Sequence, residues 1–375
     1  MCILLHRRKQ GLRGQSCRAI CRLRMASPGQ SEPSFASWQV TAVFANAPAL
    51  DITQPLLSKL REEGRSVLSA ADLGKLFADR AAPKFIKIEN PHLADWRPLR
   101  IRFGAPFEIQ LNAEPVSVQT KTRIVYFINC YINKNYIYLF SRQMAELAET
   151  KLLSETDSVL HVVSSGTESD KNVLQRELQR IFGPASSIRQ EHTEQNLFEY
   201  PGVRKVWELG RQDSDAFILY FHARGISHIK LGRFRRNRQP LEKRLFRRVI
   251  GEWRKNLLWL RAVPSADKVG ISQGGNGWIW FNFWWSRASY VAHLEEPVKT
   301  ERRHYYEDWL GRYKQSASGD YLNTLDRCIS IAYSERRNLY NVGSDFHPDR
   351  GETYLGLPFY HLRYPAFLLR RLLRD

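Results

Sequence analysis

The sequence predicts an α/β fold in which a mostly parallel β-sheet is flanked by helices. Beyond residue 119, short segments rich in β-branched and aromatic residues alternate with longer segments whose apolar residues recur at helical spacing. Alternation of this kind makes parallel strands joined by right-handed crossovers. Hydrophobic residues form 43% of the chain, which is enough to bury a core and excludes wholesale disorder.

The chain has 375 residues, so we expect a smaller unit beside a larger domain. The predicted divisions are a basic tail at 1–37, an accessory unit at 38–118, the main domain at 119–350 and a basic, aromatic extension at 351–375. The first 24 residues carry seven basic side chains and no acidic one. The tail is therefore a disordered segment, an organelle-targeting segment, or sequence upstream of a true start at Met25.

In the accessory unit, apolar spacing and turn residues predict two helices and three extended segments. The helices are expected at 52–63 and 70–78, and the extended segments at 39–44, 85–88 and 99–103. None of these segments carries a pattern of catalytic residues. We expect the unit to pack on the main domain or to present an acceptor to it.

In the main domain, four strands are expected to alternate with three helices. The predicted strands are 123–130, 158–163, 187–189 and 216–221, and the predicted helices are 136–153, 168–182 and 203–210. Ligands of such sheets bind at the carboxyl ends of the strands. The segments to inspect are therefore those that follow Cys130, Val163, Phe221 and Ser272.

Lys and Arg number 57 against 38 Asp and Glu, a net charge of +19 that favours phosphate-bearing partners such as nucleotides, nucleic acids or anionic lipids. The five cysteines indicate reduced thiols and a cytoplasmic protein, because they form no disulfide framework pattern. No apolar run reaches the ~18 residues of a membrane-spanning helix.

Three motifs follow in the second half of the chain. The strand at 216–221 leads into Tyr220–Ser227 (YFHARGIS), which is followed by Asn282–Tyr290 (NFWWSRASY) and Tyr305–Gly311 (YYEDWLG). Together they resemble a group of bacterial and viral GT-A-like glycosyltransferases. In that group a Tyr-x-His-Thr-Lys-Gly-like strand end precedes a Gly-Asn-Phe-Trp-Trp-Ala-like motif and then an acidic helix.

The resemblance covers about residues 121–315 and implies a GT-A-type domain. It implies transfer of a sugar from a nucleoside diphosphate donor to a glycan or lipid-linked acceptor, as in polysaccharide biosynthesis. Two departures are visible: Ala223-Arg224 replaces the usual Thr-Lys, and Phe281 replaces the small glycine before Asn282. The first departure keeps the positive charge, and the second puts the shape of the acceptor loop in doubt.

GT-A enzymes usually carry Asp-x-Asp at this strand end, where carboxylates hold a divalent cation on the donor diphosphate. Here the triplet is His222-Ala223-Arg224, and an arginine can bind phosphate oxygens directly. We therefore assign His222, Arg224 and Gly225 to the donor, assign no metal ligand, and hypothesise reduced or absent metal dependence. The alternative is that His222 satisfies backbone groups and Arg224 pairs with a carboxylate.

The segment Asn129–Asn135 follows the first strand of the main domain, where the resemblance implies contact with the donor base. Tyr131 is expected to stack on that base, with Asn129 and Asn133 beside it and Asn133 reading its edge. Asparagine-rich loops also occur without any ligand.

The acidic pair Glu307-Asp308 matches the family's acidic helix, which implies that one of the two carboxylates deprotonates the acceptor hydroxyl. Adjacent helical residues point about 100° apart, so only one can face the site. The family's pattern favours Asp308 over Glu307. The alternative is surface pairing with an arginine nearby: Arg302, Arg303 or Arg312.

Asn282, Trp284 and Trp285 are expected to contact the acceptor or transferred sugar, the asparagine by hydrogen bonds and the indoles by stacking. For each tryptophan the alternative is core packing. Segment 233–261 carries eleven basic and two acidic residues at amphipathic helical spacing. It is expected to contact an anionic membrane, a phosphorylated lipid carrier or an anionic glycan, or else to be a solvated helix face.

Two other functional classes remain open. High positive charge with interleaved aromatic residues also suits a nucleic-acid-binding protein, although no recognised binding module is present and no specific nucleic acid is expected. The missing Asp-x-Asp also allows an inactive relative that binds nucleotide sugars or glycans.

Overall fold

The computed structural model describes residues 39–43, 49–64, 67–78, 82–83, 85–89, 99–102, 107–111, 116–224, 226, 240–271, 273–274, 276–302, 304–314, 321–331 and 340–342. The predicted tail and C-terminal extension lie outside these ranges. In the described part of the chain no helix is both long and apolar enough to cross a bilayer.

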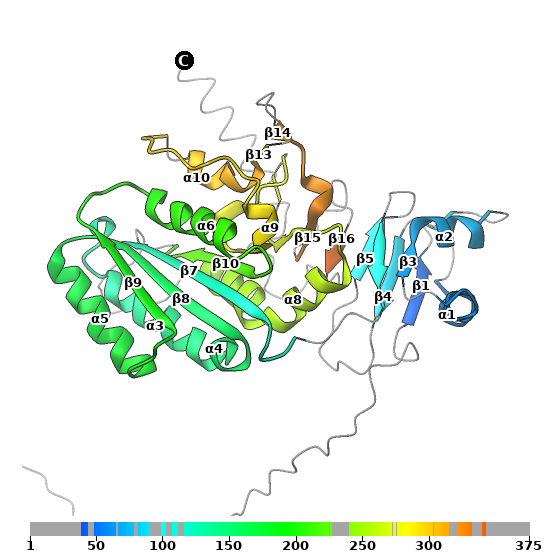
Figure 1. Cartoon of the computed structure of the whole chain (residues 1–375), viewed down its shortest axis with the longest axis horizontal. Helices are drawn as coiled ribbons and strands as arrows, with labels where there is room; N and C mark the ends of the chain where they lie inside the picture. Colours follow the sequence, from blue (N-terminus) through cyan, green and yellow to red (C-terminus); the bar gives the residue numbers. More distant parts are fainter. Residues whose placement is uncertain are drawn as a thin grey trace, which may run out of the picture. The chain divides into compact units, whose positions relative to one another are not determined.

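The first part of the chain forms an antiparallel sheet with two helices (Figure 1). Strands β1 (Gln39–Val43) and β2 (Leu50–Asp51), β4 (Phe85–Glu89) and β5 (Leu99–Arg102) pair in the order β2-β1-β4-β5. The helices are α1 (Thr53–Glu62) and α2 (Ala70–Leu76), and β3 (Val67–Ser69) pairs with β6 (Glu108–Gln110). Strands β1, β4 and β5 and both helices agree with the predicted ones to within about two residues, while β2, β3 and β6 were not predicted.

Four parallel strands form the centre of the main domain. They are β7 (Lys121–Asn129), β8 (Asp157–Ser165), β9 (Ile188–Thr193) and β10 (Phe217–His222), in the order β10-β7-β8-β9. The chain adds β8 and β9 on one side of β7 and then returns to place β10 on the other side. The direction of winding therefore reverses between β7 and β10, which is where open α/β sheets bind their ligands.

Beyond β10 the sheet continues as β12-β11-β15-β16. These strands are β11 (Lys268–Gly270), β12 (Trp284–Arg287), β15 (Cys328–Ser330) and β16 (Tyr340–Val342), and β16 pairs with β5. Strand β12 is antiparallel to both neighbours, while β11 and β15 are parallel to each other. The predicted α/β class, with a mostly parallel central sheet flanked by helices, is confirmed.

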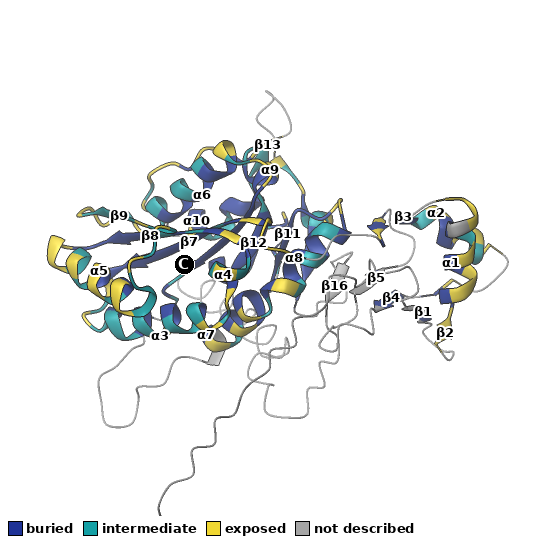
Figure 2. Ribbon diagram, turned by 60° about the horizontal axis from the view of Figure 1, so that its bottom comes forward, coloured by how far each residue is buried: buried dark blue, intermediate teal, exposed yellow. Residues whose placement is uncertain are grey.

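Helices cover both faces of this sheet (Figure 1). Helices α3 (Tyr136–Glu149), α5 (Glu168–Phe182) and α8 (Trp253–Ala262) pack on one apolar cluster, and α6 (Tyr200–Gln212) and α9 (Ala288–Val291) pack on the other. Alternate residues of β7 supply the two clusters because side chains alternate along a strand: Tyr126 faces the first and Phe127 the second. Most of β7 and β8 is accordingly dark blue, meaning buried, in Figure 2.

Helix boundaries follow local chemistry. Thr167 and Asp170 form a capping box that begins α5, and Gly183, at φ +69°, ends it. The helix predicted over 136–153 is instead divided into α3 and α4 (Leu152–Glu155), because Lys151 adopts the left-handed conformation at φ +60°.

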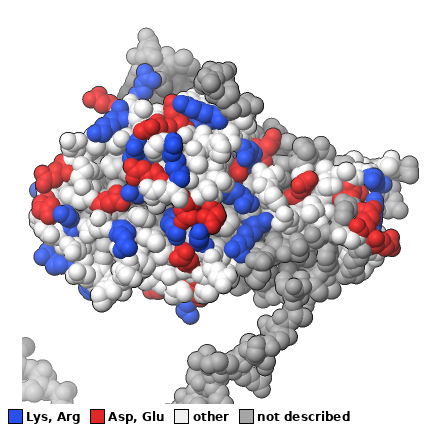
Figure 3. Space-filling view, in the orientation of Figure 1, with Lys and Arg blue, Asp and Glu red and all other residues white. Residues whose placement is uncertain are grey.

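The basic segment is helical but not one regular α-helix. Helix α7 (Pro240–Leu245) leads into a π-helix (Phe246–Gly251) and then into α8, and residues 233–239 lie outside the described ranges. Several of its charges are used internally: Arg248 is buried beside Glu252, Arg254 pairs with Glu155, and Arg261 donates to Thr120. Figure 3 shows basic and acidic side chains interspersed over the described part of one face. Contact of this segment with a membrane stays a prediction.

Candidate functional site

A carboxylate from outside the three motifs meets the histidine at the end of β10. Glu199, which directly precedes α6, places Oε1 3.2 Å from Nδ1 of His222. The Glu199 side chain is about four-fifths buried, with 20% of its area exposed. The pair lies at the carboxyl edge of the sheet, on the strand that adjoins the reversal of winding at β7.

The second oxygen of Glu199, Oε2, accepts hydrogen bonds from two other motif residues. Asn282 donates from Nδ2 to Oε2 at 2.7 Å and to the backbone oxygen of Tyr306 at 3.0 Å. The hydroxyl of Tyr220 donates to the same Oε2 at 3.3 Å. Residues of the first two motifs therefore contact one carboxylate, and Asn282 joins them to the backbone of the third motif. We call Glu199, His222, Asn282 and Tyr220 the Glu199 cluster.

Burial and hydrogen bonding act in opposite directions on the pKa of Glu199. Burial acts to raise the pKa of Glu199, but attraction to His222 and donation by His222, Asn282 and Tyr220 outweigh it, so the pKa lies below its ordinary value. The other ring nitrogen of His222, Nε2, lies 3.1 Å from the backbone oxygen of Phe281. Both ring nitrogens thus face acceptor oxygens, Nδ1 that of Glu199 and Nε2 that of the Phe281 backbone.

Arg224 follows His222 by two residues and lies over the ring of Phe281, with its guanidinium carbon 4.1 Å from the ring centroid. Phe281 and Asn282 both have left-handed backbones, at φ +75° and +51°. Phe281 thus occupies a conformation that favours the glycine expected there from the resemblance, and it serves instead as a platform for Arg224. Gly225 lies outside the described residues.

The three candidate residues after β7 lie at the same edge. Asn133 donates from Nδ2 to the backbone oxygen of Ile226 at 2.7 Å, which joins the segment after β7 to the segment after β10. Asn129 donates from Nδ2 to Oδ1 of Asn196 at 2.7 Å. Tyr131 donates from its hydroxyl to the backbone oxygen of Gly166, at 2.9 Å, and its side chain remains 43% exposed. Among the residues predicted to bind the donor, Asn133 thus reaches the segment after β10, whereas Asn129 and Tyr131 bind the segments that follow β8 and β9.

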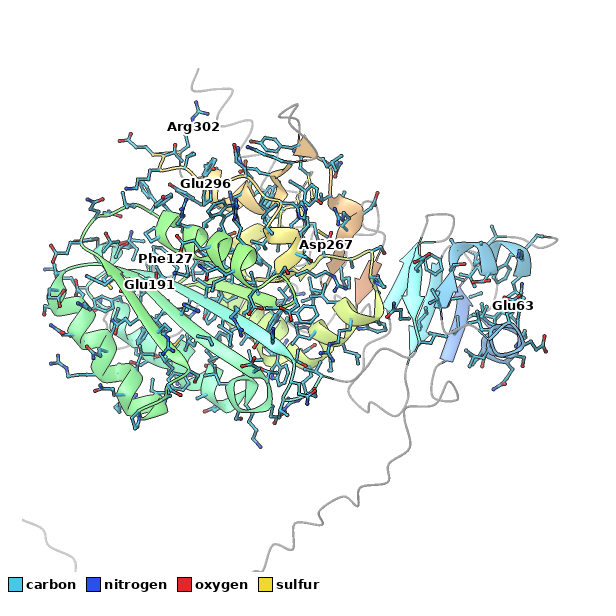
Figure 4. The ribbon with its side chains drawn as sticks, viewed as in Figure 1. Glu63, Phe127, Glu191, Asp267, Glu296 and Arg302 are labelled. Atoms are coloured by element: carbon cyan, nitrogen blue, oxygen red, sulfur yellow. The ribbon has the colours of Figure 1, made fainter. Side chains whose placement is uncertain are left out.

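Close packing of α6 holds Glu199 in place. Gly202 lies against β7 and β10 so closely that an added Cβ would be 2.7 Å from Cβ of Phe127, labelled in Figure 4, and 2.9 Å from the hydroxyl oxygen of Tyr220. Only glycine permits this approach. The first turn of α6 is thus fixed directly over the strands that carry the site.

The predicted catalytic pair lies on a short helix, α10 (His304–Asp308). Glu307 is near Nδ1 of His304, at 3.1 Å, and Asp308 accepts from Nε of Arg312 at 3.0 Å and is 42% exposed. The helix reaches the Glu199 cluster through the backbone of Tyr306, which accepts from Asn282. Pairing of Asp308 with Arg312 is one of the arrangements that the sequence left open.

The two tryptophans expected at the sugar are core residues. Trp284 is 1% exposed and packs against Tyr220, while Trp285 is fully buried and donates from Nε1 to the backbone oxygen of Val249. They extend from opposite faces of β12, a central strand with both faces covered. Neither ring is accessible to a sugar, so the stacking assignment is corrected to core packing. Asn282 is also buried, and it positions Glu199 rather than facing solvent.

A cavity of about 180 Å³ lies beside α6, between that helix and strands β8 and β9. Its lining includes Lys205 and Glu191, the latter labelled in Figure 4, and these two side chains pair at 2.8 Å. Because these charges neutralise each other, the cavity indicates no ligand. Among the described residues, no group of three or more His, Cys, Asp or Glu side chains is arranged to hold a metal ion.

Sequence reasoning missed Glu199, which lies in the unpatterned segment Glu194–Glu199 between β9 and α6. Its one signal is an acidic residue just before a helix that begins with Tyr200-Pro201. Comparison with known proteins gives no match, either to a family model or to a curated protein.

Proposed function

We propose that the chain is a glycosyltransferase of the GT-A type that uses a nucleoside diphosphate sugar and transfers the sugar to a glycan or lipid-linked acceptor. The observation that carries the proposal is that Glu199 contacts the first two motifs at the edge of β10, while Asn282 joins them to the third through Tyr306. Motifs that are far apart in sequence and share one buried carboxylate are expected of an active site rather than of separate packing positions.

In this proposal the donor lies across the segments that follow β7 and β10. Arg224 and the imidazolium of His222 supply positive charge to the diphosphate, where an Asp-x-Asp pair would otherwise hold a divalent cation. Tyr131, Asn129 and Asn133 contact the base. Both oxygens of Glu199 accept hydrogen bonds, so this carboxylate is suited to hold His222 as a cation rather than to take a proton.

The chemical step joins the acceptor oxygen to the anomeric carbon of the donor. The bond from that carbon to the diphosphate breaks, the diphosphate keeps the electron pair, and the hydroxyl proton passes to a carboxylate of α10. We assign this base to Asp308, whose 42% exposure leaves it open to an acceptor, with Glu307 as the alternative. For this step Asp308 must release Arg312 and bind the acceptor hydroxyl instead.

A donor panel tests the function. The full chain is incubated with nucleotide sugars of different base and sugar, with Mg²⁺ or Mn²⁺ and after chelation, and the release of nucleoside diphosphate is followed. Release from one donor that survives chelation is the expected result. If release requires metal, the chain is still a transferase, but His222 and Arg224 do not replace the metal ion at the diphosphate. If no donor is bound and none releases its diphosphate, the proposal is overturned.

A further inference from the structure

We propose that Phe198 is a sugar-binding platform of the acceptor site. The inference rests on the proposed glycosyl transfer and names a residue that none of the three motifs contains. Phe198 directly precedes Glu199, and its side chain is 40% exposed. Among the exposed large apolar side chains of the described chain, it is the one that adjoins the Glu199 cluster.

The backbone at Phe198 is strained. Its φ is +51°, in the left-handed region, where a bulky side chain without glycine's freedom is an outlier. Such conformations persist where the surrounding structure enforces them, and they concentrate at ligand sites. Here the next residue, Glu199, is fixed by His222 and Asn282, and the Phe198 side chain stays 40% exposed.

Hydrogen bonds place the segment that carries Phe198 across the carboxyl edge of the sheet. The hydroxyl of Tyr131 donates to the backbone oxygen of Glu194 at 2.6 Å, and Asn129 binds Asn196. Farther along the same segment, Glu199 binds His222. Phe198 therefore lies at the end of this segment next to Glu199, away from the end that Tyr131 holds.

An open aromatic ring in this position suits a sugar. The C–H face of a pyranose packs on an aromatic ring, while the hydroxyls at its rim stay hydrated. Trp284 and Trp285 cannot provide such a ring because they are buried in β12. Tyr131 lies toward the far end of the segment, where its hydroxyl is held by Gly166 and Glu194. Phe198 is thus placed to receive the acceptor, which approaches from solvent.

Binding of methyl glycosides to the full chain tests this inference without catalysis. A panel of methyl hexosides and methyl N-acetylhexosaminides is titrated by saturation-transfer NMR. At least one glycoside is expected to bind through its ring C–H protons, and Phe198→Leu is expected to weaken that binding about tenfold, since the aromatic contact is lost. Phe198→Trp keeps a ring and is expected to retain binding.

The matched control is Leu50→Ala, which removes an apolar side chain of equal exposure, 40%, from β2. Its binding should equal that of the unaltered chain. Equal binding by Phe198→Leu, or no binding of any methyl glycoside to the unaltered chain, would overturn the inference. Neither result depends on the release of nucleoside diphosphate from a donor. The donor panel therefore tests the proposed transfer separately.

Phe198→Asn separates a functional role from a structural one. Asparagine tolerates positive φ, so this variant is expected to raise the melting temperature while it weakens glycoside binding. A residue needed only for packing would lower the melting temperature when replaced. A lower melting temperature together with unchanged binding would assign Phe198 to the fold and contradict the platform.

Discussion

Oε1 of Glu199 lies 3.2 Å from Nδ1 of His222, although the first residue precedes α6 and the second ends β10. The contact joins two sides of the point where the winding of the sheet reverses. It also holds the histidine of the first motif close to Phe281, the residue over which Arg224 lies. Only the tertiary structure brings this carboxylate to the motif.

Glu199→Gln tests this pair through stability. Because the pKa of Glu199 is lowered in the folded state, its carboxylate stabilises the fold above its ordinary pKa of 4.5, and this contribution is lost as the pH falls through the lowered value. The variant should lose about 2 kcal/mol of unfolding free energy at pH 7, and the difference should shrink below pH 4.5. Urea denaturation at pH 7 and pH 4 measures both.

The control for that comparison is Glu146→Gln on α3, which removes a solvent-accessible i,i+4 pair with Arg142. Pairs of this kind on a helix contribute about 0.3–0.5 kcal/mol. A loss in Glu199→Gln no larger than this control, or one that does not vary with pH, would show that Glu199 is not held as a carboxylate by His222.

Asp308→Asn separates catalysis from binding. The exposed pair with Arg312 contributes little to stability, so the variant should fold normally. If Asp308 takes the acceptor proton, kcat should fall about 10²- to 10⁴-fold with the donor KM unchanged. Steady-state kinetics of this variant and of Glu307→Gln identify the base. If only Glu307→Gln loses activity, Glu307 is the base. Full activity in both would remove α10 from the chemical step.

Gly202→Ala tests the packing that holds α6. Alanine normally stabilises a helix relative to glycine, but here its Cβ would meet Phe127 and Tyr220 at less than 3 Å. The variant should lose about 1–3 kcal/mol of unfolding free energy. Gly74 of α2 has no atom within 4 Å of an added Cβ, so Gly74→Ala should instead gain up to about 1 kcal/mol. If the unfolding free energy changed in the same direction in both variants, the close approach of α6 to the strands would be contradicted.

Lys268 supplies an independent test at high pH. It is fully buried on β11, where its ammonium donates to Tyr290 at 2.5 Å and to Thr324 at 2.7 Å. Burial lowers its pKa from 10.5 to about 8. Between these values the unfolded chain binds a proton that the folded chain does not, so raising the pH stabilises the fold.

Relative to Lys268→Met, the unaltered chain should therefore gain about 3 kcal/mol of unfolding free energy between pH 8 and pH 10.5. Denaturant titrations of both proteins at the two pH values measure the difference, and other titrating groups cancel between them. A difference that is constant with pH would mean that Lys268 is charged throughout this range.

The fold was predictable where local signals agree. Helix α5 matches its predicted bounds because a capping box begins it and a left-handed glycine ends it. The division of α3 from α4 at Lys151 and the π-helix before α8 were missed, because backbone dihedral angles there are set by packing rather than by apolar spacing.

The site was predictable only in part. His222 and Asn282 follow from motif positions, but Glu199 is 83 residues from its partner Asn282 and has no pattern of its own. Its place depends on the approach of Gly202 to Phe127 and Tyr220, which no sequence period encodes. Trp284 and Trp285 look like surface candidates because strand alternation does not reveal that β12 is covered on both faces.

The most direct measurement of the central claim compares donor turnover by the unaltered chain, by Glu199→Gln and by the control Glu146→Gln on α3. The account predicts that the unaltered chain and the control release nucleoside diphosphate from the same nucleotide sugar, and that Glu199→Gln loses at least about 100-fold in kcat/KM, because His222 no longer has a carboxylate to hold its charge. Turnover in Glu199→Gln equal to that of the control would contradict the claim that the three motifs form their active site around this carboxylate.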